Sequence, residues 1–75
     1  MSNSASVNFL RDLGPLLVDL AARAKADAAS ADPFAQGRAM GLYEAVSLLQ
    51  QQAQAFDVRL EDLGLDGFDA DRDLL

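Results

Sequence analysis

The spacing of apolar residues between residues 32 and 56 constrains this chain more than any other feature of its sequence. Apolar side chains recur there in steps of four, three, four and three, at Leu42, Val46, Leu49, Ala53 and Phe56. Such steps keep side chains on one face of an α-helix, which has 3.6 residues per turn. Asp32 is suited to be the N-cap and Pro33 the first helical residue. We therefore predict a long helix over residues 32–56, with these apolar residues as its core or dimer contacts.

A second amphipathic pattern covers residues 6–28. Its apolar positions follow the same steps, at Leu10, Leu13, Leu17, Leu20 and Ala24. Gly14 and Pro15 interrupt the pattern, because proline has no N–H to donate and its ring crowds the carbonyl four residues earlier. The helix is therefore predicted to kink at Pro15 or to split there into a short helix followed by a long one, and we favour the split. Residues 1–5 are mostly small and polar and are expected to fray.

Small residues gather near the turn that joins the two predicted helices. The longer helix has Gly37, Gly41 and Ala45 at i, i+4 and i+8, and the end of the preceding helix has Ala21, Ala24 and Ala28. Small residues let helix backbones approach closely. We therefore predict that these two surfaces face each other beside the turn.

The longer helix also carries a second apolar row that a two-helix hairpin cannot cover. This row consists of Ala45, Leu48 and Ala55. Two completions are open: pairing with a second copy in a dimeric four-helix bundle, or folding of residues 57–75 over the exposed side. We predict one all-α domain over residues 1–75, a helical hairpin with a short C-terminal helix or docked acidic segment, completed as a dimeric bundle.

Residues 57–75 carry most of the charge of the chain. Seven acidic and two basic residues give this stretch a net charge of −5, out of −6 for the whole chain. We predict a short helix over residues 60–63 that ends at Gly64, because glycine readily adopts the left-handed conformation that ends helices. Leu65 and Phe68 are expected to pack against the hairpin, and the rest of the segment is expected to be loosely held.

The acidic segment is a candidate partner-binding surface. Its carboxylates could compete with a nucleic acid for a basic groove on another protein. Tyrosine and arginine are also over-represented where interfaces concentrate binding energy. The candidate partner-binding residues are therefore Asp62, Asp66, Asp69, Asp71, Asp73, Arg38 and Tyr43.

The composition argues against several classes of function. The 75 residues include no cysteine and no histidine, so disulfides, the usual zinc-ligand sets and the common nucleophilic triads cannot be built. Asp69, Asp71 and Asp73 alternate as in the opening of a calcium loop, but Leu74 stands where that loop needs glycine. We expect no enzyme activity, no cofactor and no metal.

The charge balance and the hydropathy pattern narrow the choice of partners. A net charge of −6 and a pI near 4.1 oppose direct binding to nucleic acid. No apolar run approaches the length that spans a bilayer, and no leader pattern is evident at the start. We expect a cytoplasmic protein whose partner is another protein, with a homodimer as its own assembly.

Residues 60–75 resemble the prosthetic-group segment of acyl carrier proteins. Asp62, Leu63, Gly64, Asp66 and Asp69 match its Asp-Leu-Gly-x-Asp-Ser-Leu-Asp pattern. Gly67 occupies the place of the serine to which phosphopantetheine would be attached, and Phe68 replaces the following leucine. The resemblance therefore implies no prosthetic group on this chain.

The stretch Gly-Arg-x-x-Gly-Leu-Tyr-Glu-x-x-Ser, residues 37–47, followed by Gln-Gln-x-Gln-x-Phe, is similar to that of small uncharacterised helical proteins of proteobacteria and their phages. The likeness spans residues 34–75 and implies an accessory protein. Small acidic proteins in that setting include inhibitors of host defence complexes, among them anti-CRISPR proteins.

Two functional hypotheses follow. The first is a non-enzymatic interaction module, an acidic inhibitor or adaptor that occupies a basic or apolar surface of a partner complex, with a phage-derived anti-CRISPR-type inhibitor as one form. The alternative is a structural or regulatory dimerisation subunit, such as an antitoxin-like or recombination-accessory protein. That subunit would contact its partner through the long helix.

Overall fold

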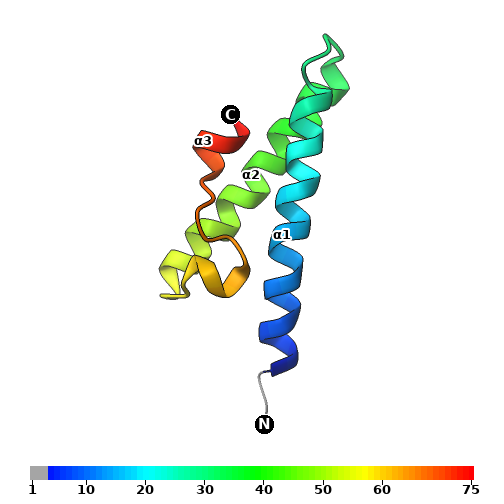
Figure 1. Ribbon diagram of the computed structural model, residues 1–75. Coiled ribbons are helices and arrows are strands. Elements are labelled where there is room, and N and C mark those ends of the chain that lie inside the picture. The colour runs from blue at the N-terminus through cyan, green and yellow to red at the C-terminus, as the bar shows by residue number, and fades with distance from the viewer. Residues whose placement is uncertain (1–3) are drawn as a thin grey trace.

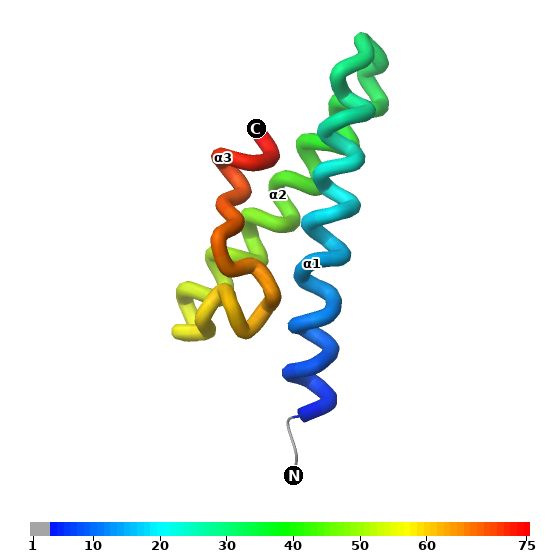
Figure 2. The backbone as a smooth tube through the Cα atoms, viewed as in Figure 1, coloured from blue at the N-terminus to red at the C-terminus, as the bar shows by residue number. Residues whose placement is uncertain are grey.

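Two long antiparallel helices form the frame of the protein. In the computed structural model, which describes residues 4–75, α1 spans Ser4–Asp27 and α2 spans Pro33–Ala55. Figures 1 and 2 show that the helices lie together at the turn and diverge toward their other ends. The molecule is elongated, with extents of 49 × 20 × 17 Å. All regular elements in the described part are helical, so the predicted all-α hairpin is confirmed.

The start of α2 forms as the sequence predicts, whereas its end is less regular. The side chain of Asp32 accepts a hydrogen bond from the Phe34 N–H at 3.1 Å, and Pro33 is the first helical residue. At the other end Asp57 takes a left-handed conformation with φ 58°. The Val58 N–H then donates to the Ala53 carbonyl at 2.7 Å, which satisfies a carbonyl that the helix leaves open.

The first helix is continuous through Gly14 and Pro15, so the favoured split at this point is wrong. Pro15 leaves the Arg11 carbonyl without its helical donor, and Gly64 of the C-terminal segment lies directly against that carbonyl and the Pro15 ring. The C-terminal segment therefore packs against α1 at the point where Pro15 interrupts the helical hydrogen bonds. Of the residues expected to fray, Ser4 and Ala5 belong to α1, and residues 1–3 lie outside the described part.

The C-terminal segment folds back over one side of the hairpin (Figure 1). It contains a 3₁₀-helix, η1, over Leu60–Leu63, and a short helix, α3, over Ala70–Leu74. As predicted, η1 ends at Gly64 in the left-handed conformation, and Leu65 is packed down with only 1% of its surface exposed. The expectation of a loosely held end is wrong, because α3 buries Ala70 and Leu74.

The core consists of two connected clusters along the groove between the helices. One brings α1, α2 and α3 together through Ala21, Val46, Ala70 and Leu74, with Leu17, Val18, Leu42, Tyr43 and Phe68 packed around them. The other joins α2 to η1 and the following turn through Ala53, Leu63 and Leu65, with Val18, Leu49 and Leu60 around them. Four of the five predicted core positions of α2 therefore belong to this core.

Two predicted packing roles in and beside α2 are not found within this chain. Of the two roles predicted for Phe56, core or dimer contact, its exposure excludes the core role, because it caps the helix with 76% of its surface exposed. Gly37, Gly41 and Ala45 do not face the preceding helix either: all three are exposed, and a Cβ atom built on either glycine would have no neighbour within 4 Å. Ala21 and Ala24 of α1, by contrast, are buried, and Ala28, just after α1, is half-buried.

Candidate interaction surface

The aspartates of the last helix are engaged within their own segment. One Asp69 carboxylate oxygen accepts hydrogen bonds from the N–H groups of Asp71 and Arg72, at 2.9 and 3.3 Å, and so caps α3. Asp73 accepts from the Asp69 N–H at 3.0 Å and pairs with Arg72 at 2.8 Å. The Arg72 hydrogen bond, followed by that N–H, lowers the pKa of Asp73 to about 2. These carboxylates therefore stabilise the local fold of the C-terminal segment.

Three side chains from the hairpin hold α3 in place. The Tyr43 hydroxyl donates to the Asp71 carboxylate at 2.5 Å, and this bond raises the pKa of Tyr43. The Gln50 amide donates to the Phe68 carbonyl at 3.0 Å and accepts from the Ala70 N–H at 3.1 Å. Lys25 donates to the Asp73 carbonyl at 3.1 Å. Tyr43 thus acts as an internal anchor.

The remaining predicted partner-binding residues lie apart from this cluster. Asp62 pairs with Arg59 at 3.4 Å, and that guanidinium also contacts Glu61 at 2.9 Å. Asp66 is exposed on the turn between η1 and α3. Arg38 lies near the hairpin turn, 3.8 Å from the Asp27 carboxylate. The structure therefore brings Tyr43 together with the aspartates of α3, and it does not bring Arg38 to them.

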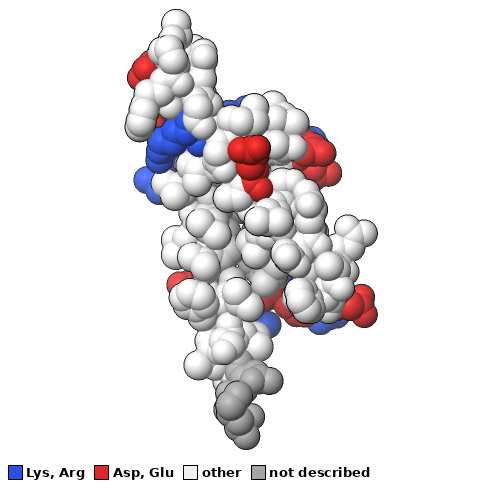
Figure 3. Space-filling view, turned by 180° about the vertical axis from the view of Figure 1, so that it is seen from behind, with Lys and Arg blue, Asp and Glu red and all other residues white. Residues whose placement is uncertain are grey.

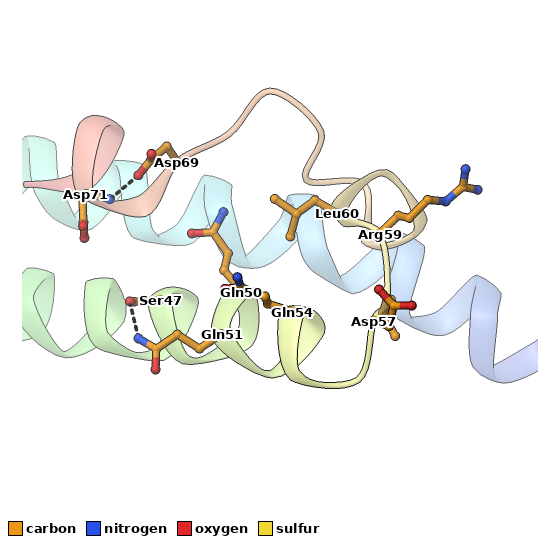
Figure 4. A pocket seen from close by; sticks show the side chains of 10 residues that line it. Ser47, Gln50, Gln51, Gln54, Asp57, Arg59, Leu60, Asp69 and Asp71 are labelled. Carbon is orange, nitrogen blue, oxygen red and sulfur yellow. Dashed lines mark hydrogen bonds between the residues drawn. The ribbon is translucent and has the colours of Figure 1, made fainter.

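A groove of about 490 Å³ runs between the second half of α2 and the C-terminal segment (Figure 4). Polar, charged and apolar residues line it together: Ser47, Gln50, Gln51, Gln54, Asp57, Val58, Arg59, Leu60, Asp69 and Asp71. Gln50 points from α2 toward the segment, as Figure 4 shows, while Gln51 bonds to Ser47 along the helix at 3.1 Å. The role of Gln50 could not be predicted from the sequence, because this residue stands among other glutamines on a polar face of the helix.

The side of the hairpin opposite the C-terminal segment exposes large apolar side chains. The most prominent, with their exposed fractions, are Phe9 (64%), Leu16 (59%), Leu48 (57%) and Phe56 (76%), and Phe34 is also exposed. We call this side the back face, defined by these five residues with Gly37, Gly41 and Ala45. It includes Leu48 and Ala45 of the second apolar row, which the chain leaves uncovered.

Helix geometry places Leu16 and Leu48 on the side opposite the C-terminal segment. At about 100° per residue, Leu16 lies about 160° around α1 from Gly14, which contacts the C-terminal segment at Leu63. Leu48 likewise lies about 160° around α2 from Gln50, which binds that segment. Leu16 and Leu48 therefore point away from the segment, whereas Val7 and Leu10, each 40% exposed, lie on the same side of α1 as Gly14.

The net charge also differs between the two sides of the molecule. The C-terminal segment has a net charge of −5, which leaves −1 for residues 1–56 out of the total of −6. Figure 3, seen from behind, shows charged side chains only sparsely over much of this side of the molecule. The protein thus has an acidic front, formed by the docked segment, and a largely uncharged back face.

Other kinds of site find little support in the described part of the chain. Among residues 4–75, no group of three His, Cys, Asp or Glu side chains is placed to hold a metal ion. Neither long helix combines the length and the hydropathy that crossing a membrane requires. The chain matches no protein-family model, no curated protein and no solved structure.

Proposed function

We propose that this chain is a non-enzymatic protein-binding module and that the back face is its contact surface. The observation that carries the proposal is the exposure of more than half of Phe9, Leu16, Leu48 and Phe56 on one side of the hairpin. Soluble monomers rarely leave large contiguous apolar patches open to water, and such patches mark interaction sites. One of the two hypotheses from the sequence was contact with a partner through the long helix. The position of the exposed apolar side chains favours that hypothesis.

The predicted four-helix bundle fits this proposal as its assembled form. A helical hairpin with one covered and one open face presents half of such a bundle. Helices from another chain would cover the back face and bury its aromatic side chains. A chain of only 75 residues gains stability from such an assembly, because its own core is small.

Recognition through the acidic front is the second candidate, in the form of an inhibitor that occupies a basic surface. The net charge of −5 on residues 57–75 favours this second candidate. The carboxylates available for this role are the exposed ones outside α3, such as Asp57, Glu61 and Asp66. Deleting residues 69–75 would not test it cleanly, because that deletion also removes Ala70 and Leu74 from the core.

The test compares charged substitutions on the back face with the same charges elsewhere. The double variant Leu16→Asp, Leu48→Asp should keep its helical circular dichroism, since both side chains are exposed, and should lose binding to partner proteins and to itself. The control is Ala22→Asp with Ala29→Asp, which adds two charges at exposed positions outside the back face.

Binding is measured by light scattering of the purified chain and by affinity capture with a purified partner. Equal binding by the Leu16→Asp, Leu48→Asp chain and the control would refute the back-face proposal. If binding instead disappears in an Asp57→Asn, Glu61→Gln, Asp66→Asn variant, the acidic front is the contact surface.

A further inference from the structure

We infer that the occupant of the back face is a second copy of this chain, and that the two copies meet along α2 in antiparallel orientation with Gly41 at the crossing point. The inference rests on the proposed function and names its partner. Three properties of the back face support it: two unexplained glycines, a symmetric arrangement of large and small residues, and the distribution of charge.

The two glycines have no use within one chain. Gly37 and Gly41 lie inside α2, where glycine is less favourable than alanine because it loses more conformational freedom on folding. A Cβ atom on either would meet nothing within 4 Å, so no neighbour in this chain requires its absence. Glycine on an exposed helix face allows another backbone to approach closely. The position of Gly41 therefore points to a helix from outside the chain.

The back face of α2 is symmetric about Gly41. Phe34 and Leu48 stand seven residues before and after it, and both are exposed. Gly37 and Ala45 stand four residues before and after it. In an antiparallel pair centred on Gly41, Phe34 of each copy lies beside Leu48 of the other, and Gly37 lies opposite Ala45. Large side chains then meet at the two ends of the contact and small ones at its centre.

This symmetry favours a second copy over an unrelated helix. A two-fold interface uses the same patch on both partners, so residues at equal distances from the axis must fit one another. A different partner would require no such match between the two halves of α2. Antiparallel pairing is also the orientation in which Phe34 meets Leu48, whereas parallel pairing would set each residue against itself.

The charge distribution permits this arrangement and opposes others. Two copies carry −6 each, and −5 of that lies on the docked segment. Contact through the back faces leaves the two acidic segments on opposite outer surfaces, where water and salt screen them. Any contact through the fronts would bring the two segments together at a cost in repulsion. The back face is therefore the side on which two such acidic chains can associate.

The absence of cysteine allows a direct test by cross-linking. The variants Phe34→Cys and Leu48→Cys each place one thiol at an exposed position, so neither should unfold the chain. Mixed and treated with a short thiol-to-thiol cross-linker, they should give a covalent dimer with one chain of each kind. Each variant alone should stay uncross-linked, because identical residues are separated by about 21 Å along the antiparallel helices.

Gly41→Leu provides a second, independent readout. A Cβ atom at this exposed position meets nothing within 4 Å in the same chain, so the helices should persist, but the leucine side chain blocks the crossing point. Light scattering should show the unsubstituted chain at twice its 8.0 kDa and self-association at least about tenfold weaker in the variant. Gln54→Leu, which adds the same side chain at an exposed position of α2 outside the back face, is the control and should still dimerise.

The possible results separate this inference from the proposed function. Cross-linking of each variant with itself would overturn the antiparallel arrangement, and a mass of 8.0 kDa at all concentrations would overturn the second copy as partner. If the chain is monomeric but binds another protein in a manner that Leu48→Asp abolishes, the back face keeps its function with a different partner. If it is monomeric and no binding depends on Leu48, both proposals fail.

Discussion

Two pairs of glycines in this protein lie in opposite environments. Gly14 and Gly64 meet at the contact between α1 and the C-terminal segment: a Cβ on Gly14 would overlap the Leu63 carbonyl oxygen, and one on Gly64 would lie 2.7 Å from the Pro15 ring. Gly37 and Gly41 face open space. The first pair is required by the fold of one chain, and the second pair is not.

The difference teaches how the two sides of the hairpin are used. On the front, close backbone contacts, buried leucines and a capped α3 are all satisfied within the chain. On the back face, no part of the same chain packs against the two glycines, and the large apolar side chains stay exposed. A substitution that adds a methyl group should therefore have opposite effects on the two sides, and the predictions below follow from that contrast.

The largest effect is expected from Gly14→Ala. The added methyl group collides with the backbone of Leu63, which cannot move without displacing η1 from α1. Overpacking of this kind costs more than alanine gains as a helix former, so we expect a loss of about 2–3 kcal/mol in unfolding free energy. Urea denaturation followed by circular dichroism measures it. Unchanged stability would show that the front contact is looser than described.

A smaller loss is expected from Gln50→Ala. This change removes two hydrogen bonds and leaves the Phe68 carbonyl and the Ala70 N–H without their partner, at a cost of about 1–2 kcal/mol. Hydrogen exchange of the Ala70 amide should accelerate. Gln54→Ala is the matched control in the same helix, and an equally fast Ala70 amide in that variant would contradict the specific role of Gln50.

Substitutions at the open glycines should stabilise the single chain. Gly37→Ala and Gly41→Ala fill no occupied space, and each should raise the unfolding free energy by about 0.5–1 kcal/mol through helix propensity alone. Thermal unfolding is compared at protein concentrations low enough to keep the chain monomeric. A loss of stability under these conditions would place an intrachain contact at the back face.

The smallest effect is expected from the protonation of Asp73 at low pH. The folded pKa of Asp73 is lowered from 3.8 to about 2, so its contribution to stability is present above about pH 4 and is lost as the pH falls through about 2. Asp73→Asn should therefore be less stable than the parent at neutral pH, and the difference should shrink between about pH 4 and 2. Urea midpoints over this range measure it, and a constant difference would rule out the titration of Asp73 as its source.

Periodicity and capping residues were sufficient to predict the long second helix, the start of α2 at Pro33 and the end of η1 at Gly64. These features depend on neighbours a few positions away. The favoured split of the first helix at Pro15 was wrong, and the packing of Gly64 against Pro15 could not be predicted, because the two residues lie far apart in the chain.

The candidate site was predicted less completely. The acidic residues were identified, but their engagement with Tyr43, Arg72 and backbone groups is a matter of tertiary geometry. Gln50 has the same sequence signal as its neighbouring glutamines. The small-residue line from Gly37 to Ala45 was predicted to face the preceding helix, and spacing alone could not show that it is exposed instead.

The docking of α3 also has a consequence for the order in which the molecule assembles. The hairpin begins with contacts beside its turn, such as that between Asp27 and Arg38, whereas the bond from Lys25 closes a separation of 48 residues. Local contacts form sooner because they close shorter loops. A nascent hairpin therefore exposes Val46 and Ala21 on one side as well as aromatic side chains on the other. Docking of the C-terminal segment then covers Val46 and Ala21, while the aromatic side chains of Phe9, Phe34 and Phe56 stay exposed to water.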